Sequence, residues 1–176
     1  MALPAGTHNL GPENASLVVK TYREGVAAKA GHDLVIEVTR WEATVDAAAE
    51  RVELSADSRS LEVREGLRGI KPLTDKDRRE IRTNIDDKVL HEEPITFLST
   101  AVRTAGERLV VEGDLTIAGS TRPVTAELDI GAGGRIAGTI PLTQSAWGIK
   151  PYRGLMGALK VRDELEIVIE ARLPAG

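Results

Sequence analysis

Strict alternation of apolar and polar residues recurs along most of this 176-residue chain and limits its fold more than any other feature. A period of two is typical of β-strands that have one buried and one solvated face. The clearest segments are 32–38, 51–57, 107–119, 123–130 and 164–171, with weaker ones at 17–23, 41–46, 95–104 and 135–143. Because most segments have a polar face, the pattern favours an antiparallel sheet.

About eight long strands follow one another, separated by short turn-forming stretches such as 105–107 and 131–134. Such a set most simply closes into a barrel, because closure removes the exposed edges. We therefore predict an all-β fold, an eight-stranded antiparallel barrel. Residues 16–173 form its single domain, and residues 1–15 are expected to be a flexible segment.

Residues 74–90 break the alternation. Ile81, Ile85 and Val89 repeat every four residues, which places them in one apolar stripe on a helix. Thr74 is a suitable N-cap, and Asp77 stands three residues later, as in a capping box. The segment is predicted to be an amphipathic helix that lies on the barrel or over one of its mouths.

Large rings are scarce in this chain, because aromatic residues make up only 3% of it. The interior must then be filled by Val, Ile, Leu and Ala, which either pack solid or leave a void. An eight-stranded barrel is wide enough to hold one small ligand. Strand phase selects these candidates for the lining of such a cavity: Leu34, Ile36, Val38, Val52, Leu54, Phe97, Val111, Leu115, Ile117, Leu128, Ile140, Ile167 and Ile169.

Several function classes find no support in the sequence. No cysteine is present, the net charge is −4 without a long block of like charges, and no two of the three histidines have metal-ligand spacing. The acids fall mainly on outward strand positions, where they do not form a catalytic pair. We expect no catalytic residue, metal or cofactor, and no nucleic-acid partner.

The first residues contain neither a basic region nor an apolar one of the kind found in signal peptides. No apolar run reaches the roughly 20 residues that a membrane helix needs. We therefore expect a cytoplasmic protein without stable membrane insertion.

His32 follows Gly31 and is in phase with Leu34, so its side chain is predicted to point inward near a strand end. It either forms a hydrogen bond at the barrel rim or contacts the polar head of a ligand. Two other roles stay open. His32 could be an axial ligand of haem, or a base that acts with Lys150 in a small enzyme.

Residues 147–161 are unusually basic and aromatic for this chain, with three cations and no acid. In a structural interpretation, glycines shape a tight connection while Trp147 and Met156 plug one end of the barrel. In a functional interpretation, Trp147, Tyr152 and Met156 form a pliable apolar lip. Lys150 and Arg153 then receive an amphiphile's polar head. Both interpretations make the segment a portal.

Three segments together resemble a known protein family. They are "PLTDKDRREIRTNIDDKVLHEEPITFLST", "EGDLTIAGSTRPVTAELDI" and "WGIKPYRGLMGALKVRDELEIVIEARL". The second segment is the most specific, and its matching residues are Leu115, Thr116, Ile117, Gly119, Thr121, Arg122, Pro123 and Val124. The chain resembles the YceI-like, polyisoprenoid-binding family over residues 16–173.

The resemblance implies a lipocalin-like barrel whose cavity holds a polyprenyl chain or an isoprenoid quinone. It also implies frequent formation of homodimers and no catalytic residues. The expected function is non-enzymatic binding, sequestration or transport of such a lipid. The alternatives are another small apolar ligand, haem, a small enzyme, or a solid barrel that serves in protein interaction or stress response.

Overall fold

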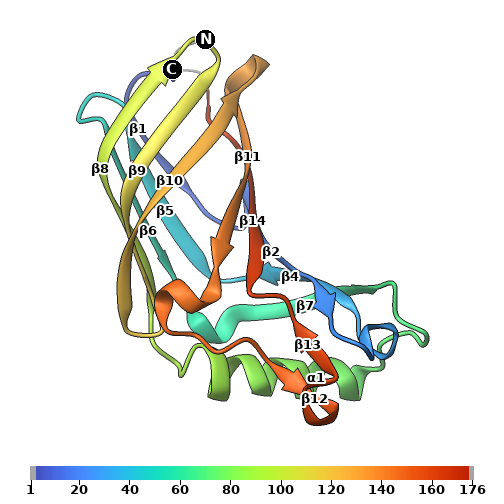
Figure 1. Cartoon of the computed structure of the whole chain (residues 1–176). Coiled ribbons are helices and arrows are strands. Elements are labelled where there is room, and N and C mark those ends of the chain that lie inside the picture. The colour runs from blue at the N-terminus through green and yellow to red at the C-terminus, as the bar shows by residue number, and fades with distance from the viewer. Residues whose placement is uncertain (1–2, 175–176) are drawn as a thin grey trace.

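The computed structural model describes residues 3–174, most of which form one curled antiparallel sheet with a helix across one end (Figure 1). In sheet order the strands are β1 (Thr7–Leu10), β5 (Trp41–Asp46), β6 (Arg51–Ala56), β8 (Ile95–Ala105), β9 (Arg108–Ile117), β10 (Ser120–Ile130), β11 (Arg135–Thr143), β14 (Glu164–Arg172), β2 (Ala15–Thr21), β4 (Asp33–Val38) and β7 (Leu61–Leu67). Every neighbouring pair is antiparallel. The all-β antiparallel class is confirmed, and all nine predicted segments are strands.

Two bends in the chain explain why the sheet has eleven strands instead of the eight predicted. β4 runs into β5 through Thr39 and Arg40, and β6 runs into β7 through the short turn η2 (Ser58–Ser60). At these corners the Thr39 N–H donates to the Ser60 carbonyl oxygen at 2.8 Å, and the Asp57 N–H donates to that of Arg40 at 3.0 Å. When each bent stretch is counted as one strand, eight long strands and β1 remain.

The curled antiparallel sheet confirms the barrel-like fold predicted from the sequence. β1 and β7 stand at the ends of the strand order, but β4 continues into β5 and β6 continues into β7. These two bent stretches pair with each other, with β2 on one side and with β8 on the other, so they join the two sides of the sheet around its interior. The helix packs next to β7 and so covers that edge.

The N-terminal segment differs from the flexible one expected over residues 1–15. β1 pairs with β5 over four residues, from Thr7 opposite Asp46 to Leu10 opposite Ala43. His8 and Leu10 are buried, and His8 Nε2 lies 2.9 Å from the Pro4 carbonyl oxygen. Four residues were too few for the alternation to stand out in the sequence.

The helix predicted over 74–90 is confirmed. It consists of α1 (Asp75–Asn84) followed by a π-helical turn, η3 (Ile85–Val89). Thr74 Oγ1 accepts the Asp77 N–H at 3.1 Å, and the Asp77 carboxylate accepts the Thr74 N–H at 2.9 Å, so the capping box is complete. The sequence left two positions open for the helix, and the structure has it across one end of the barrel.

A small second sheet lies beside the helix. It contains β12 (Arg153–Gly154), β13 (Leu159–Val161) and β3 (Arg23–Glu24). The other short helical turns are η1 (Ala28–Ala30), η4 (Ala132–Gly134), η5 (Gln144–Trp147) and η6 (Leu155–Gly157).

The barrel is solid at one end and hollow at the other. Leu109, Ile130, Ile136 and Leu173 are almost fully buried and form part of the close-packed core. Further along β9 and β10, toward the helix, residues such as Leu115 are only partly buried and border an internal space. Both alternatives that the sequence left open, a packed interior and a void, are therefore present in one molecule.

Candidate functional site: an apolar cavity closed by the helix

A cavity of about 680 Å³ lies between the inner face of the sheet and the helix. All thirteen residues selected by strand phase line it: Leu34, Ile36, Val38, Val52, Leu54, Phe97, Val111, Leu115, Ile117, Leu128, Ile140, Ile167 and Ile169. Their role in binding remains a prediction. The position of their side chains follows from the alternation, because every second residue of a strand points to the same face.

The helix forms the cavity's lid. Ile81, Ile85 and Val89, the stripe seen in the sequence, all line the cavity from the side opposite the strands. No residue of α1 is fully buried, so the helix covers the cavity without being embedded in the core. Its side-chain contacts with the barrel include a hydrogen bond from Arg82 to the Arg59 carbonyl oxygen at 2.6 Å.

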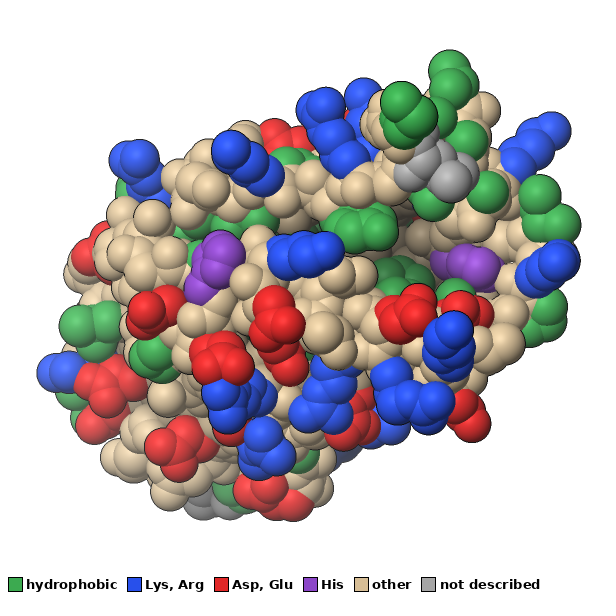
Figure 2. All heavy atoms as spheres, turned by 90° about the horizontal axis from the view of Figure 1, so that it is seen from below, with side chains coloured by type: hydrophobic (Ala, Val, Ile, Leu, Met, Phe, Trp, Pro, Cys, Tyr) green, Lys and Arg blue, Asp and Glu red, His purple; other side chains and the backbone are tan. Residues whose placement is uncertain are grey.

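The polar residues of the lining are concentrated near the helix and the small sheet. Seven of them are Arg23, His32, Lys71, Asp77, Glu80, Asn84 and Lys160. Figure 2 shows this end of the molecule, where a recess between hydrophobic side chains has a histidine and charged residues at its margin. The cavity is thus apolar in its depth and polar at its mouth, which suits an amphiphile.

His32 lies at this mouth. Its Nε2 donates to the Lys71 carbonyl oxygen at 2.5 Å, which is the hydrogen bond at the rim that one interpretation expected. A Cβ on Gly69 would lie only 1.9 Å from the same nitrogen, so the ring fits closely against the 66–72 loop. Because Nε2 is engaged with this carbonyl group, it is not directed at a ligand such as haem iron.

Trp147 closes the cavity beside β9. It belongs to η5, is only 5% exposed and lines the cavity, and its indole N–H donates to the Leu115 carbonyl oxygen at 2.9 Å. Gly148 ends this turn with a φ of 74°, a left-handed conformation that suits glycine. Tyr152 also lines the mouth and is partly exposed.

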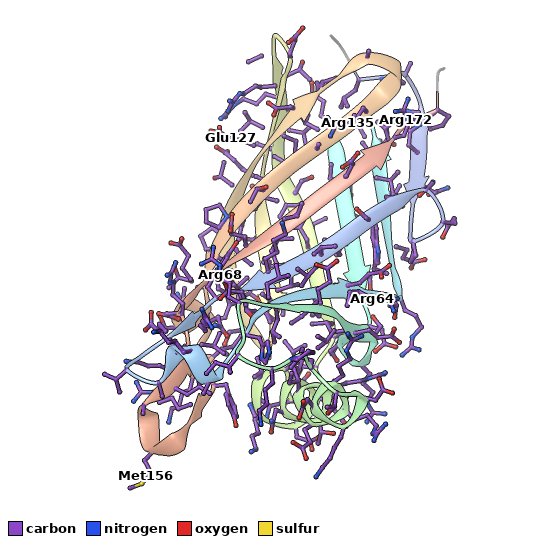
Figure 3. The ribbon with its side chains drawn as sticks, turned by 90° about the vertical axis from the view of Figure 1, so that its right-hand side faces the viewer. Arg64, Arg68, Glu127, Arg135, Met156 and Arg172 are labelled. Atoms are coloured by element: carbon purple, nitrogen blue, oxygen red, sulfur yellow. The ribbon has the colours of Figure 1, made fainter. Side chains whose placement is uncertain are left out.

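Three predicted portal residues do not reach the cavity. Lys150, Arg153 and Met156 are exposed and are not part of its lining. Met156 stands at the outer tip of the loop between β12 and β13, far from the strand ends near Arg135 and Arg172 (Figure 3). The lining therefore gives no support to Lys150 and Arg153 as head-group ligands, and that role stays a prediction.

The side chain of Tyr22 connects the end of β2 to β14. The Tyr22 hydroxyl donates to the Glu166 carboxylate, and this bond raises the pKa of Tyr22. The Arg162 guanidinium lies 5.6 Å from the centre of the same ring, within the range of a cation–π contact. These contacts hold the end of β2 against the start of β14.

Sequence reasoning missed the charged groups that border the mouth. Asp77 and Glu80 looked like part of the solvated helix face, and Lys71 lies in a loop without a pattern. The only available signal was their position in or just before a helix expected to cover the barrel.

The described residues do not support a metal site or a catalytic pair involving His32. Within residues 3–174, no three His, Asp or Glu side chains are grouped so that they could hold a metal ion. His32 lines the cavity and Lys150 does not, so the two residues required for an acid–base enzyme do not share it. Over the same residues, no helix is long and apolar enough to span a bilayer.

Comparison with known proteins identifies the family of this fold. The YceI-like domain matches residues 18–173. The crystal structure of BcnA from Burkholderia cenocepacia is similar, with a TM-score of 0.65 and 19% identity over 89% of this chain and 94% of that one. For the YceI protein of Campylobacter jejuni, the TM-score is 0.55 and the identity 14%, over 77% and 81% of the two chains. No curated protein matches this chain at a significant level. Since the domain match extends over most of the sequence, the protein belongs to the YceI-like family.

Proposed function

We propose that this protein binds an amphiphilic, isoprenoid-like lipid and sequesters or carries it without changing it chemically. The observation that carries the proposal is the cavity, which is aliphatic in its depth and polar only near the helix. A polyprenyl chain or the tail of an isoprenoid quinone matches the deep part. The polar head of either lipid then lies at the mouth.

The size of the cavity suits such a tail. At about 30 Å³ for each water-sized group, a volume of 680 Å³ holds roughly 20 groups, the length of a chain of about 20 carbon atoms. Each buried methylene contributes about 0.8 kcal/mol, before the losses from immobilising the ligand. Binding therefore requires no covalent bond and no catalytic group.

The mouth offers partners for a head group. Arg23, Lys71 and Lys160 border it as cations, and Tyr152 adds a hydroxyl. A guanidinium can hold a phosphate by two parallel hydrogen bonds, and an ammonium acts as a point charge. In the proposal these residues bind the polar head group, a role that the sequence analysis gave to Lys150 and Arg153.

A titration tests the proposal. Tryptophan fluorescence is followed while geranylgeraniol, geranylgeranyl diphosphate or a short-chain ubiquinone is added to the delipidated protein. We expect saturable one-to-one binding of at least one of them, with hexadecane as the control that lacks a head group. Failure of all prenyl compounds to bind, under conditions in which another apolar molecule of similar size binds, would contradict the isoprenoid assignment.

A further inference from the structure

Most of the large exposed apolar side chains among the described residues lie at one end of the molecule. Val26, Ile70 and Met156 are 97%, 73% and 107% exposed, and Leu67 and Tyr152 are about half exposed. Only Leu98, on β8, lies elsewhere. Apolar residues gathered in this way on a soluble domain mark an interaction site more often than scattered ones do.

Three loops that are distant in sequence meet at this end. They are residues 25–32, 67–72 and 150–158, which we call the tip loops. The Ala27 N–H donates to the Ala158 carbonyl oxygen at 2.8 Å, and His32 binds the Lys71 carbonyl group. Arg23 donates to the carbonyl groups of both Gly31 and Arg68. The three loops thus form one continuous surface around the cavity mouth.

The tip loops carry cations but no acids. They contain Lys29, Arg68, Lys71, Lys150 and Arg153 and not a single Asp or Glu, in a chain of net charge −4. Arg68 pairs with Asp33 at 3.2 Å. Among the residues that the structure describes, the other four cations have no ion-pair partner within 4.0 Å. Figure 2 shows hydrophobic and basic side chains alternating along the right-hand edge of this end.

The tip loops include residues with a left-handed backbone. Met156 has a φ of 56°, a left-handed conformation that costs a non-glycine residue about 1–2 kcal/mol. Gly25, next to Val26, has a φ of 100°, and a Cβ there would lie 2.4 Å from the Ala158 carbonyl oxygen. Strain of this kind persists where the surrounding structure maintains it, and it is frequent at functional sites.

We propose that the tip loops dock the protein on an anionic lipid bilayer, with Val26, Ile70 and Met156 entering the interface between head groups and acyl chains. Lys29, Lys71, Lys150 and Arg153 then lie among the lipid phosphates. The inference rests on the proposed function, since a bilayer is the natural source of a lipid that enters the neighbouring mouth. Peripheral docking of this kind needs no membrane-spanning segment.

Flotation with lipid vesicles tests the docking. The full chain is mixed with vesicles of phosphatidylcholine alone or with an equal part of phosphatidylglycerol. We expect it to float with the anionic vesicles only, and less so at high salt, because each cation near an anionic surface raises partitioning about fivefold. A parent protein that stays unbound with anionic vesicles overturns the proposal.

Variants locate the contact. The apolar variant combines Val26→Ser, Ile70→Ser and Met156→Ser, and the charge variant combines Lys29→Gln, Lys150→Gln and Arg153→Gln. Each should lower vesicle binding at least tenfold. Leu98→Ser is the matched apolar control, and Arg103→Gln with Arg135→Gln and Arg172→Gln is the matched charge control, since none of these residues belongs to the tip loops. If the tip variants float as the parent does, the assigned surface is wrong.

Two further measurements separate the outcomes. Sedimentation velocity without lipid reports whether the tip loops join two copies of the chain. If the parent protein forms a dimer that the apolar variant abolishes, and the parent does not float with vesicles, the tip loops serve self-association and the docking proposal is overturned. The apolar variant should still bind geranylgeraniol from solution, because none of its three residues lines the cavity. If parent and variant both fail to bind it while the parent still floats, the proposed function fails and docking stands.

Discussion

The indole N–H of Trp147 donates to the Leu115 carbonyl oxygen at 2.9 Å, which ties the η5 turn to β9 at the cavity wall. Both residues also line the cavity. This hydrogen bond therefore fixes η5, the turn that follows β11, against the wall of the cavity. It explains why a tryptophan stands at this point in a chain with few aromatic residues.

Trp147 should report on binding. The chain has two tryptophans, and the other, Trp41, is buried but does not line the cavity. We expect Trp41→Phe to retain the fluorescence change caused by geranylgeraniol and Trp147→Phe to lose it. Among the described residues Trp41 Nε1 has no hydrogen-bond partner, so Trp41→Phe breaks no hydrogen bond and loses only some packing in the core. A signal that follows Trp41 instead would place the ligand elsewhere.

A polar substitution in the wall should weaken binding selectively. Leu115→Gln places an amide against the ligand's chain, and burial of an unpaired amide costs about 1–3 kcal/mol, equivalent to roughly 5- to 150-fold in affinity. Leu98→Gln is the matched control, because Leu98 is exposed on the outer face of β8. Titration of both variants with geranylgeraniol gives the comparison. Equal affinities would show that the lipid does not occupy this cavity.

The fit of His32 against Gly69 predicts a coupling between the two positions. Gly69→Ala puts a methyl group 1.9 Å from His32 Nε2, so it should destabilise the protein by about 1–3 kcal/mol. In a His32→Ala background the same change should be nearly neutral. Denaturant unfolding of the four proteins measures this coupling. An additive result would mean that the two side chains do not meet.

The N-terminal cap of the helix should control how tightly the lid is held. Thr74→Ala removes the acceptor for the Asp77 N–H and is expected to cost about 0.5–2 kcal/mol of helix stability. Because Ile81, Ile85 and Val89 close the cavity, a frayed helix should release geranylgeraniol faster. Stopped-flow dissociation measures this rate, with Thr83→Ala, on the exposed side of the same helix, as the control. An unchanged dissociation rate in Thr74→Ala would show that the stability of the helix does not control ligand release.

Acid should loosen the same cap. The pKa of Asp77 is lowered because its carboxylate accepts the Thr74 backbone N–H. A carboxyl with a lowered folded-state pKa stabilises the fold fully above its unfolded pKa, about 3.9, and loses that contribution as pH falls through the folded value. Ligand release should therefore accelerate below about pH 4 in the parent. Asp77→Asn should lack this added dependence, and Asp75→Asn, which keeps the cap, should retain it.

Much of the fold and site could be predicted because it depends on local periodicity. The phase of Leu115 and Ile167 along their strands placed both in the lining, and the stripe from Ile81 to Val89 identified the inner face of the helix. The Thr74 cap was equally visible. These features need only the geometry of one strand or one helix.

Other features depend on contacts that no local pattern encodes. The corner at Thr39 is set by its bond to Ser60, twenty-one residues away, and beyond this corner the chain pairs with β1 instead of β2. Met156 is fully exposed and has a left-handed backbone conformation, which no local pattern in the sequence predicts. Lys150 and Arg153 resembled head-group ligands in the sequence because of their charge, although neither lines the cavity.

Native mass spectrometry of the protein purified without detergent, with solvent extraction of a parallel sample, tests the central claim most directly. We predict a species heavier than the polypeptide by the mass of one lipid, and an extract that contains a prenyl compound. A bare polypeptide mass that stays unchanged after incubation with geranylgeraniol, prenyl phosphates and isoprenoid quinones would contradict the account.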